Sequence, residues 1–359
     1  MSVNLVIDPE IRRARLPPGE MYGDPQWHAA LQERVFHRSW QLLYAIDDAE
    51  AQTTAIPVDH PAAPLVFTRG DHGEALLSNV CTHRGATVID APCRARTLRC
   101  PYHGRRWKPD GRLAAAPGFE GALEFPTQRD DLAAVDVAGL GPWRFGAVQP
   151  AVPFDDWAGP VGPWLAGLWE TSLQLHAEES RAYEMDANWA LYVDNYLEGF
   201  HVNYVHPGLA EVLDPRDYRQ ELFPWGTMQL GMATSPEDAI VLPEGHPLFG
   251  EQIAGLYLWL FPNLMINVYP WGVSLNVVEP LGPMRTRVVY RTWVADPSRR
   301  GGGAGGDLHQ VEMEDQMVVA RAQDGVRSPL YPGGRYSPAH EVGLHHFHRL
   351  LAKRLGSNT

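Results

Sequence analysis

The pattern of hydrophobic and polar positions changes twice before the middle of the chain. Residues 25–40 place Leu31, Val35 and Phe36 at helical spacing, which predicts one amphipathic helix. From 41 to about 150 the apolar runs are short and are broken by Gly, Pro and Asp, which is typical of small antiparallel strands joined by turns. A segment rich in Pro and Gly, residues 149–163, then marks the expected domain boundary.

The second half of the chain mixes strands with helices. Runs rich in β-branched and aromatic residues predict strands, and a Gly-rich stretch at 299–306 predicts a flexible linker that ends at Asp307, a suitable helix N-cap. The expected strands are 257–261, 264–269 and 274–278, and the expected helices are 188–200, 307–322 and 338–355. These elements predict an α+β protein with a helical arm (1–40), a β domain (41–150) and a mixed domain (151–359).

Composition narrows the possible function classes. The 359 residues carry a formal net charge of −13, which disfavours nucleic acid as a partner because binding to it depends on clustered Lys and Arg. No apolar run reaches the roughly eighteen residues of a membrane span, and the N-terminus lacks the apolar segment of a signal peptide. Three cysteines provide no disulfide framework. We therefore expect a cytoplasmic protein that binds neither nucleic acid nor a membrane.

Two short loops carry the first candidate chemistry. Cys81 and His83 are separated by one residue, and Cys100 and His103 by two. One type of [2Fe–2S] centre needs two thiolates on one iron and two imidazoles on the other, and each loop supplies one of each. Zinc sites also use two Cys and two His, but they usually pair Cys with Cys and His with His. The spacing favours the iron–sulfur cluster, and we interpret Cys93 as an inert buried thiol rather than a spare ligand or redox thiol.

The residues around these ligands, Cys-Thr-His-Arg-Gly (81–85) and Cys-Pro-Tyr-His-Gly-Arg-Arg-Trp (100–107), resemble the Rieske domain of Rieske non-haem iron oxygenases. Residues 193–201 and 334–351 are similar to the ring-hydroxylating oxygenase α-subunits, especially to their choline monooxygenase-like branch. The resemblance covers nearly the whole chain. It implies an N-terminal Rieske [2Fe–2S] β domain and a C-terminal helix-grip catalytic domain, in which helices pack on an antiparallel sheet.

Two histidines, His201 and His206, predict a second metal site. Five helical steps of about 100° leave two side chains about 140° apart, so the helix must unwind near His206, where Pro207 and Gly208 permit it. Non-haem Fe(II) oxygenases bind iron through two His and one carboxylate, which leaves positions open for dioxygen and substrate. The carboxylate must come from elsewhere in the chain.

Two acids on the expected helix after residue 307 compete for the third ligand position. Composition does not choose between Glu314 and Asp315. The family resemblance does choose, because the Glu-Asp pair followed by Val-Val and a later Gln is similar to the family's third-ligand helix, which implies that Asp315 binds the iron.

The resemblance also implies how electrons reach the mononuclear iron. In this family they cross to the neighbouring subunit of a homotrimer, through an acidic residue that joins a cluster histidine of one chain to an iron-binding histidine of the next. Glu198, three residues before His201, occupies the bridging position, and Asp194 is the alternative. Asn195 is expected near the iron.

The expected reaction follows from the same resemblance. A ferredoxin or flavin reductase would pass electrons from NAD(P)H to the cluster, and dioxygen at the Fe(II) would hydroxylate or oxidatively demethylate a small organic substrate. A quaternary ammonium or N-methyl compound is the first choice, and an aromatic compound oxidised by a ring-hydroxylating dioxygenase is the alternative. An electron carrier of the Rieske ferredoxin type would need only the first domain. Five aromatic residues are candidates to bind a cation, although strand aromatics are more often core: Trp225, Tyr257, Trp259, Tyr269 and Trp271.

Two further groups of residues stand out in the sequence. Basic residues crowd the first domain, where their positive field would attract an acidic electron carrier, although a solvated loop surface explains them equally well. They are Arg84, Arg94, Arg96, Arg99, Arg105, Arg106, Lys108 and Arg112. The alternative for His345, His346 and His348 is another metal site, but the resemblance implies that they are structural residues of the terminal helix.

Overall fold

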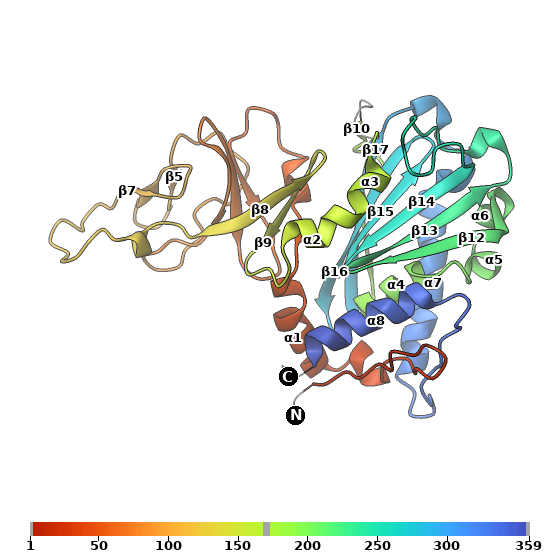
Figure 1. Ribbon diagram of the computed structural model, residues 1–359. Helices are drawn as coiled ribbons and strands as arrows, with labels where there is room; N and C mark the ends of the chain where they lie inside the picture. The colour runs from red at the N-terminus through yellow and green to blue at the C-terminus, as the bar shows by residue number, and fades with distance from the viewer. Residues whose placement is uncertain (1–2, 168–172, 357–359) are drawn as a thin grey trace. The chain divides into compact units, whose positions relative to one another are not determined.

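The short apolar runs after residue 40 form antiparallel strands, as their pattern predicts. The computed structural model describes residues 3–167 and 173–356, and the protein has the expected α+β fold. The chain divides into a small unit, residues 36–151, and a large unit formed by residues 1–35 with 152–359 (Figure 1). Our predicted boundary treats residues 1–40 as a separate arm, whereas in the structure residues 1–35 belong to the large unit.

The small unit contains two antiparallel sheets. In the larger sheet the strand order is β1-β9-β8-β4-β3-β2, and in the smaller it is β5-β6-β7. The first sheet comprises β1 (Gln41–Leu42), β2 (Ala55–Val58), β3 (Leu65–Gly70), β4 (Gly73–Ser78), β8 (Ala134–Leu140) and β9 (Trp143–Ala147). The second comprises β5 (Leu98–Arg99), β6 (Arg106–Trp107) and β7 (Leu113–Ala115).

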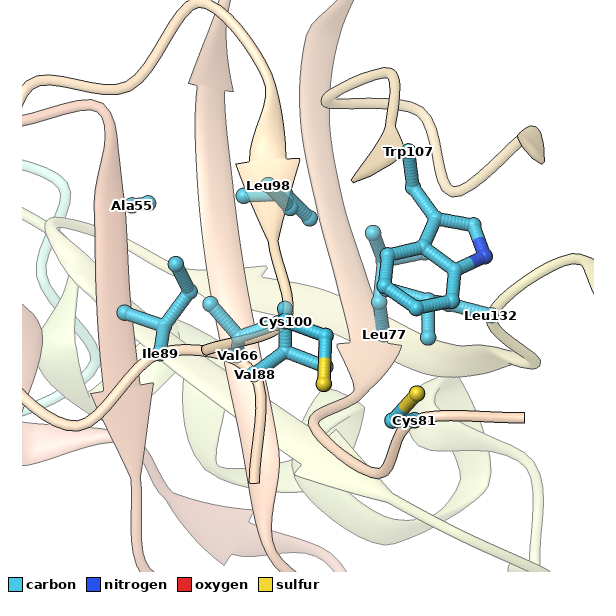
Figure 2. Close-up of a cluster of buried hydrophobic side chains, with 10 residues drawn as sticks. All are labelled: Ala55, Val66, Leu77, Cys81, Val88, Ile89, Leu98, Cys100, Trp107 and Leu132. Carbon is cyan, nitrogen blue, oxygen red and sulfur yellow. The ribbon is translucent and has the colours of Figure 1, made fainter. Parts of the chain in front are cut away.

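A buried hydrophobic cluster supports the cysteine loops of the small unit. It joins residues of both sheets and includes the sulfur-bearing side chains of Cys81 and Cys100, which are only 4% and 1% exposed. Trp107 is fully buried within this cluster. Figure 2 shows the ten side chains: Ala55, Val66, Leu77, Cys81, Val88, Ile89, Leu98, Cys100, Trp107 and Leu132. Because both cysteine side chains are buried in this core, hydrophobic packing fixes the positions of the two loops.

The large unit is built on one antiparallel sheet of eight strands. Its order is β10-β17-β16-β15-β14-β13-β12, with β11 also paired to β17. All three predicted strands lie in it, and each is part of a hairpin with its neighbour in sequence. The strands are β10 (Gln174–Leu175), β11 (Ala182–Met185), β12 (Leu213–Phe223), β13 (Gly226–Ala233), β14 (Ile253–Leu260), β15 (Leu264–Tyr269), β16 (Gly272–Gly282) and β17 (Arg285–Val294).

Helices pack on this sheet and carry most of the candidate site residues. Helix α8 contacts β12, α4 contacts β16 and β17, and α7 contacts α4 (Figure 1). Among the described residues, none of the helices has the length and hydrophobicity that crossing a bilayer requires. The helices are α1 (Pro25–Arg34), α2 (Phe154–Ala158), α3 (Gly162–Leu165), α4 (Trp189–Tyr196), α5 (Val202–Val205), α6 (Pro207–Val212), α7 (Leu308–Val326) and α8 (Val342–Leu355).

Helix boundaries differ from the predicted ones for local reasons. Helix α1 ends at Arg34, so Val35 and Phe36 lie beyond it and are fully buried in the fold. Helix α4 ends at Tyr196 rather than at residue 200. Asp307 caps its helix as predicted, by accepting from the N–H of Gln310. Asn188 caps α4 in the same way, by accepting from the N–H of Ala190.

The predicted flexible linker at 299–306 is wrong, because this segment packs against the sheet. Ala304 is 6% exposed, and the carbonyl of Gly305 accepts a hydrogen bond from Trp271 Nε1 at 3.0 Å. A Cβ atom on Gly305 would lie 2.5 Å from Trp271 Nε1, so glycine is needed for this close approach. The glycine content predicted a flexible segment, but Gly305 instead allows the backbone to pack closely against Trp271 and Tyr269.

Candidate metal centres

The two cysteine loops of the small unit have the same backbone turn. In each, the N–H of a glycine donates to the carbonyl of the cysteine four residues earlier, Gly85 to Cys81 at 2.9 Å and Gly104 to Cys100 at 3.2 Å. Both glycines have positive φ, 72° and 74°, a conformation that side chains with a Cβ rarely adopt. The Cys-Thr-His-Arg-Gly and Cys-Pro-Tyr-His-Gly patterns therefore specify two matching turns that present their ligand side chains together.

The four predicted ligands of these loops lie close to one another. The rings of His83 and His103 are 4.8 Å apart between centroids and meet edge to face. Burial, with a further contribution from the neighbouring Cys100 thiol, raises the pKa of the Cys81 thiol, and both cysteines belong to the same buried cluster. His83 Nδ1 is buried without a hydrogen-bond partner. An orphaned imidazole nitrogen on one loop, a second imidazole next to it and one buried thiol on each loop fit a [2Fe–2S] cluster, whose iron would supply the missing partner.

Cys93 lies apart from this ligand set. Its backbone pairs with Ala55 through two hydrogen bonds, and its half-buried side chain packs against the hydrophobic cluster of Figure 2. Burial raises the pKa of this thiol, which makes it less reactive.

In the large unit, His201 and His206 flank a single short helix. His201 lies just before α5, and His206 lies between α5 and α6 with non-helical dihedrals, φ −119° and ψ 77°. The chain therefore unwinds at His206, immediately before Pro207, as we predict. It also unwinds between Tyr196 and Val202, which the predicted helix over 188–200 does not anticipate.

These two imidazoles meet the carboxylate of Asp315 on α7. Its Oδ1 lies 3.0 Å from His206 Nε2 and 3.7 Å from His201 Nε2. Among the described residues this is the one group of three whose ligand atoms lie close enough, all within 4.8 Å, to hold a metal ion. Bonds of roughly 2.1 Å place neighbouring octahedral donors about 3 Å apart, so two His and one Asp in this arrangement fit a mononuclear iron.

Carboxylates also contact the outer nitrogen of each histidine. Glu198 Oε1 lies 2.7 Å from His201 Nδ1, and Glu314 Oε2 lies 2.7 Å from His206 Nδ1. Glu314 thus faces the side of His206 opposite to Asp315. Burial lowers the pKa of His206, but the hydrogen bonds to Asp315 and Glu314 outweigh it and raise the pKa above its usual value.

The remaining site candidates lie on α4. Asn195 Nδ2 donates to Asp315 Oδ1 at 2.6 Å, so it reaches the ligand set directly. Asp194 points elsewhere: its carboxylate accepts from the Tyr22 hydroxyl at 3.0 Å and lies 2.9 Å from His348 Nε2. The structure therefore places Glu198, and not Asp194, in contact with His201.

The histidines of α8 have separate partners. His348 Nδ1 lies 2.8 Å from the Tyr336 hydroxyl, and His345 Nε2 lies 2.8 Å from the carbonyl of Asp8. Burial lowers the pKa of His346.

A cavity opens from the Asp315 group into the large unit. The volume of the cavity, including the space at its opening to solvent, is about 780 Å³. Of the five aromatic candidates, Tyr257 and Tyr269 line it, whereas Trp259 and Trp271 are core and Trp225 lies against Lys353 and Arg354. Most of the other polar and aromatic lining residues were not predicted: Tyr192, Tyr196, Tyr218, Gln229, Asn267, Asn276 and Tyr290.

The sheet register explains how these residues meet. Tyr257 on β14 stands opposite Gln229 on β13 and Asn267 on β15, and Tyr290 on β17 stands opposite Asn276 on β16. Tyr192 and Tyr196 are four residues apart and therefore share one face of α4. That spacing is a signal in the sequence, whereas the strand register is not.

Two family models match the chain. Residues 39–126 match the Rieske [2Fe-2S] domain, and residues 173–357 match the catalytic domain of the ring hydroxylating alpha subunit. The chain is 31% identical to the chloroplastic choline monooxygenase of Arabidopsis thaliana, over 97% of this chain and 85% of that protein. It is 27% identical to the carnitine monooxygenase oxygenase subunit of Escherichia coli K12, over 94% and 92% of the two proteins.

Solved structures have the same fold. A complex of the quaternary ammonium Rieske monooxygenase CntA with an inhibitor matches with a TM-score of 0.79 at 22% identity, covering 98% of this chain and 99% of that one. Naphthalene 1,2-dioxygenase from Rhodococcus with bound indole matches with a TM-score of 0.75 at 19% identity, covering 94% of each chain.

Proposed function

The chain belongs to the Rieske-type ring-hydroxylating oxygenase α-subunit family, and we propose that it oxidises a small quaternary ammonium or N-methyl compound. It is an oxidoreductase whose cofactors are a [2Fe–2S] cluster and a mononuclear iron, with dioxygen as cosubstrate and electrons supplied by a reductase. The observation that carries the substrate proposal is the cavity, which is rich in tyrosine. Among its described lining residues none is Lys or Arg, so no fixed cation competes with a cationic ligand.

We assign the metal ligands as the sequence predicts. Cys81, His83, Cys100 and His103 would hold the cluster, and His201, His206 and Asp315 would hold the mononuclear iron. When bound, the cluster transfers single electrons and the mononuclear iron activates dioxygen. The support for the second set is its geometry around Asp315 Oδ1.

The protein's own residues orient these ligands. Glu198 and Glu314 accept from the Nδ1 atoms of His201 and His206, which turns each Nε2 toward the metal position. Asn195 donates to Asp315 and limits the rotation of its carboxylate. The aromatic wall of the cavity excludes water from the reacting C–H bond and orients the substrate above the metal position.

Electron delivery is part of the proposal. We infer that the protein forms a homotrimer and that Glu198 bridges His201 to a cluster histidine of the next subunit. One carboxylate oxygen of Glu198 contacts His201 Nδ1, and the other accepts the N–H groups of Phe200 and His201. The exposed basic residues near the cluster loops are the proposed docking surface for an acidic ferredoxin or flavin reductase: Arg84, Arg94, Arg96, Arg99, Arg106, Lys108 and Arg112. Arg105 is buried and forms a salt bridge with Asp130, so it does not belong to this surface.

We also propose a cytoplasmic location. None of the three cysteines, Cys81, Cys93 and Cys100, forms a disulfide, which suits a reducing compartment. Cell fractionation should recover the protein with a cytoplasmic marker.

The decisive experiment is product analysis with a chemically reduced cluster and dioxygen. The panel contains quaternary ammonium, N-methyl, methoxy-aromatic and unsubstituted aromatic compounds. An aldehyde, including formaldehyde, from the first two classes is the expected result. Diol or phenol from the aromatic compounds alone would keep the oxygenase class but reject the proposed substrate. That result would favour ring hydroxylation, the second candidate function, which is suggested by the shared fold with naphthalene 1,2-dioxygenase.

A further inference from the structure

A fully buried carboxylate lies behind the cavity wall. Glu312, on α7 one turn before Asp315, is 0% exposed. Its Oε2 accepts hydrogen bonds from the hydroxyls of Tyr192 and Tyr290, each at 2.6 Å, and its Oε1 accepts from Gln316 Nε2 at 2.7 Å. Among the described residues, the hydrogen-bond partners of this carboxylate are all neutral, namely two phenol hydroxyls and one amide. Neutral donors alone therefore stabilise its charge.

Two tyrosines connect this carboxylate to the cavity. Tyr192 on α4 and Tyr290 on β17 both line the cavity together with His201 and Asp315. Burial raises the pKa of each tyrosine well above its usual value, so both hydroxyls stay protonated and donate hydrogen bonds to Glu312. A phenol that donates to a carboxylate becomes richer in electrons, and the face of its ring attracts cations more strongly.

A purely structural role for Glu312 would not need a charge. Holding α7 to α4 and β17 requires only an acceptor, which a glutamine amide also provides. Burial, together with the nearby charge of Asp315, raises the pKa of Glu312 to about 7 against the effect of the three hydrogen bonds, so keeping this group ionised is costly. A cation in the cavity would offset that cost and favour the ionised form.

We propose that Glu312 determines specificity by acting, through Tyr192 and Tyr290, as the counter-charge that favours a cationic substrate over a neutral molecule of the same shape. The inference rests on the proposed function in one respect, which is that the substrate enters this cavity. It deepens that function by assigning the selection of charge to a residue that does not touch the substrate.

The test compares two ligands that differ only in charge. Choline and its neutral isostere 3,3-dimethylbutan-1-ol are titrated by calorimetry into the iron-loaded enzyme. The wild type should bind choline more tightly. Glu312→Gln should weaken choline binding about tenfold and leave the isostere unchanged, since the shape of the side chain is kept. Asp324→Asn, at an exposed position on the same helix, removes one charge away from the cavity and should change neither Kd.

A second variant keeps the proposal testable if Glu312→Gln does not fold or does not bind iron. Tyr290→Phe retains the ring but removes one donor from Glu312, so its ionised form is less stable and the preference for choline should fall in the same direction. Equal weakening of both ligands would indicate a structural role and overturn the proposal, as would a wild type that binds both ligands equally. The product analysis decides the proposed function separately. An enzyme that oxidises quaternary ammonium compounds without needing Glu312 would keep that function and lose this inference.

Discussion

At the scale of single residues, each of the two candidate iron-binding histidines is oriented by a carboxylate at its outer nitrogen. An imidazole whose Nδ1 donates a proton must present a lone pair at Nε2, and this is the form that binds a metal. Glu198 acts in this way on His201 and Glu314 on His206, both at 2.7 Å. The carboxylates thus set the tautomer as well as the ring angle. Glu314, a competitor for the ligand position in the sequence, has its own role beside Asp315.

The role of Glu198 can be tested with Glu198→Gln. The amide keeps the length of the side chain but cannot act as a charged acceptor between two imidazoles. We expect normal iron content and a single-turnover rate about 10- to 100-fold slower. Asp194→Asn is the matched control, because Asp194 contacts Tyr22 and His348 and not His201. This variant should lower stability and leave the single-turnover rate near that of the wild type. The reverse outcome would assign the bridge to Asp194.

A buried histidine of the small unit predicts a dependence of stability on pH. His60 is 8% exposed, and its Nδ1 accepts the N–H of Ala62. Burial lowers its pKa from 6.5 to about 4, so the folded state holds it neutral while the unfolded chain protonates it below 6.5. Its contribution to stability is therefore full above pH 6.5 and is lost as the pH falls toward 4.

The variant His60→Asn keeps an acceptor for Ala62 and cannot be protonated in this range. Between pH 7 and pH 5 the wild type should lose about 2 kcal/mol more than the variant. The urea concentration at which the cluster absorbance disappears reports on the small unit alone and provides the measurement. Parallel curves for the two proteins would show that His60 is not the titrating group.

At the scale of elements, the breaks in regular structure position the site. His201 and His206 lie at the two ends of α5, so a four-residue helix turns both imidazoles toward α7. The segment 299–306 brings Ala304 into the cavity wall and places Gly305 against Trp271 and Tyr269. Segments that look like interruptions in the sequence therefore form part of the cavity and of the candidate metal site.

The packing of this segment can be tested with Gly305→Ala. The added Cβ would lie 2.5 Å from Trp271 Nε1 and 2.7 Å from Tyr269 Cγ. We expect a loss of about 1–3 kcal/mol in stability and a higher KM, because Tyr269 lines the cavity. Gly302→Ala is the control, since its Cβ meets no atom within 4 Å. Equal melting temperatures for the two variants would restore the flexible-linker interpretation.

At the scale of the whole molecule, each proposed metal site is built within one unit. The four proposed cluster ligands all lie in residues 36–151, and the three proposed iron ligands all lie in the large unit. Each unit also has its own hydrophobic core. Catalysis therefore needs electrons to pass from one unit to another, and we propose that the two belong to different subunits of the trimer.

Mixed trimers test this transfer. Cys100→Ser removes a cluster ligand and Asp315→Ala removes an iron ligand, so each variant alone should be inactive, and Asp315→Ala should retain the Rieske absorbance. If electrons cross to the next subunit, co-expressed variants should regain about a quarter of the wild-type activity, because half of the intact iron sites then face an intact cluster. Complete inactivity of the mixture would place both sites of each electron path in one chain.

The sequence by itself determined the family, the α+β class and the ligand types. Both Cys-His loops and the Asp307 helix are local patterns in which spacing, capping and glycine conformation act over a few residues. The family models confirm the Rieske oxygenase prediction, while the individual ligand roles stay predictions. The positions of three strands along the chain could be predicted for the same reason, since runs rich in β-branched and aromatic residues favour strands locally.

Only the tertiary structure decided which residues surround the site. Tyr257, Gln229 and Asn267 meet through strand register, and Glu312 meets Tyr192 and Tyr290 from three separate elements. The packing of 299–306 and the separation of Asp194 from His201 have the same origin. These contacts join positions far apart in the chain, and no local preference encodes them. The chemistry of the metal sites could thus be predicted from short motifs, whereas the shape and charge of the substrate cavity required the fold.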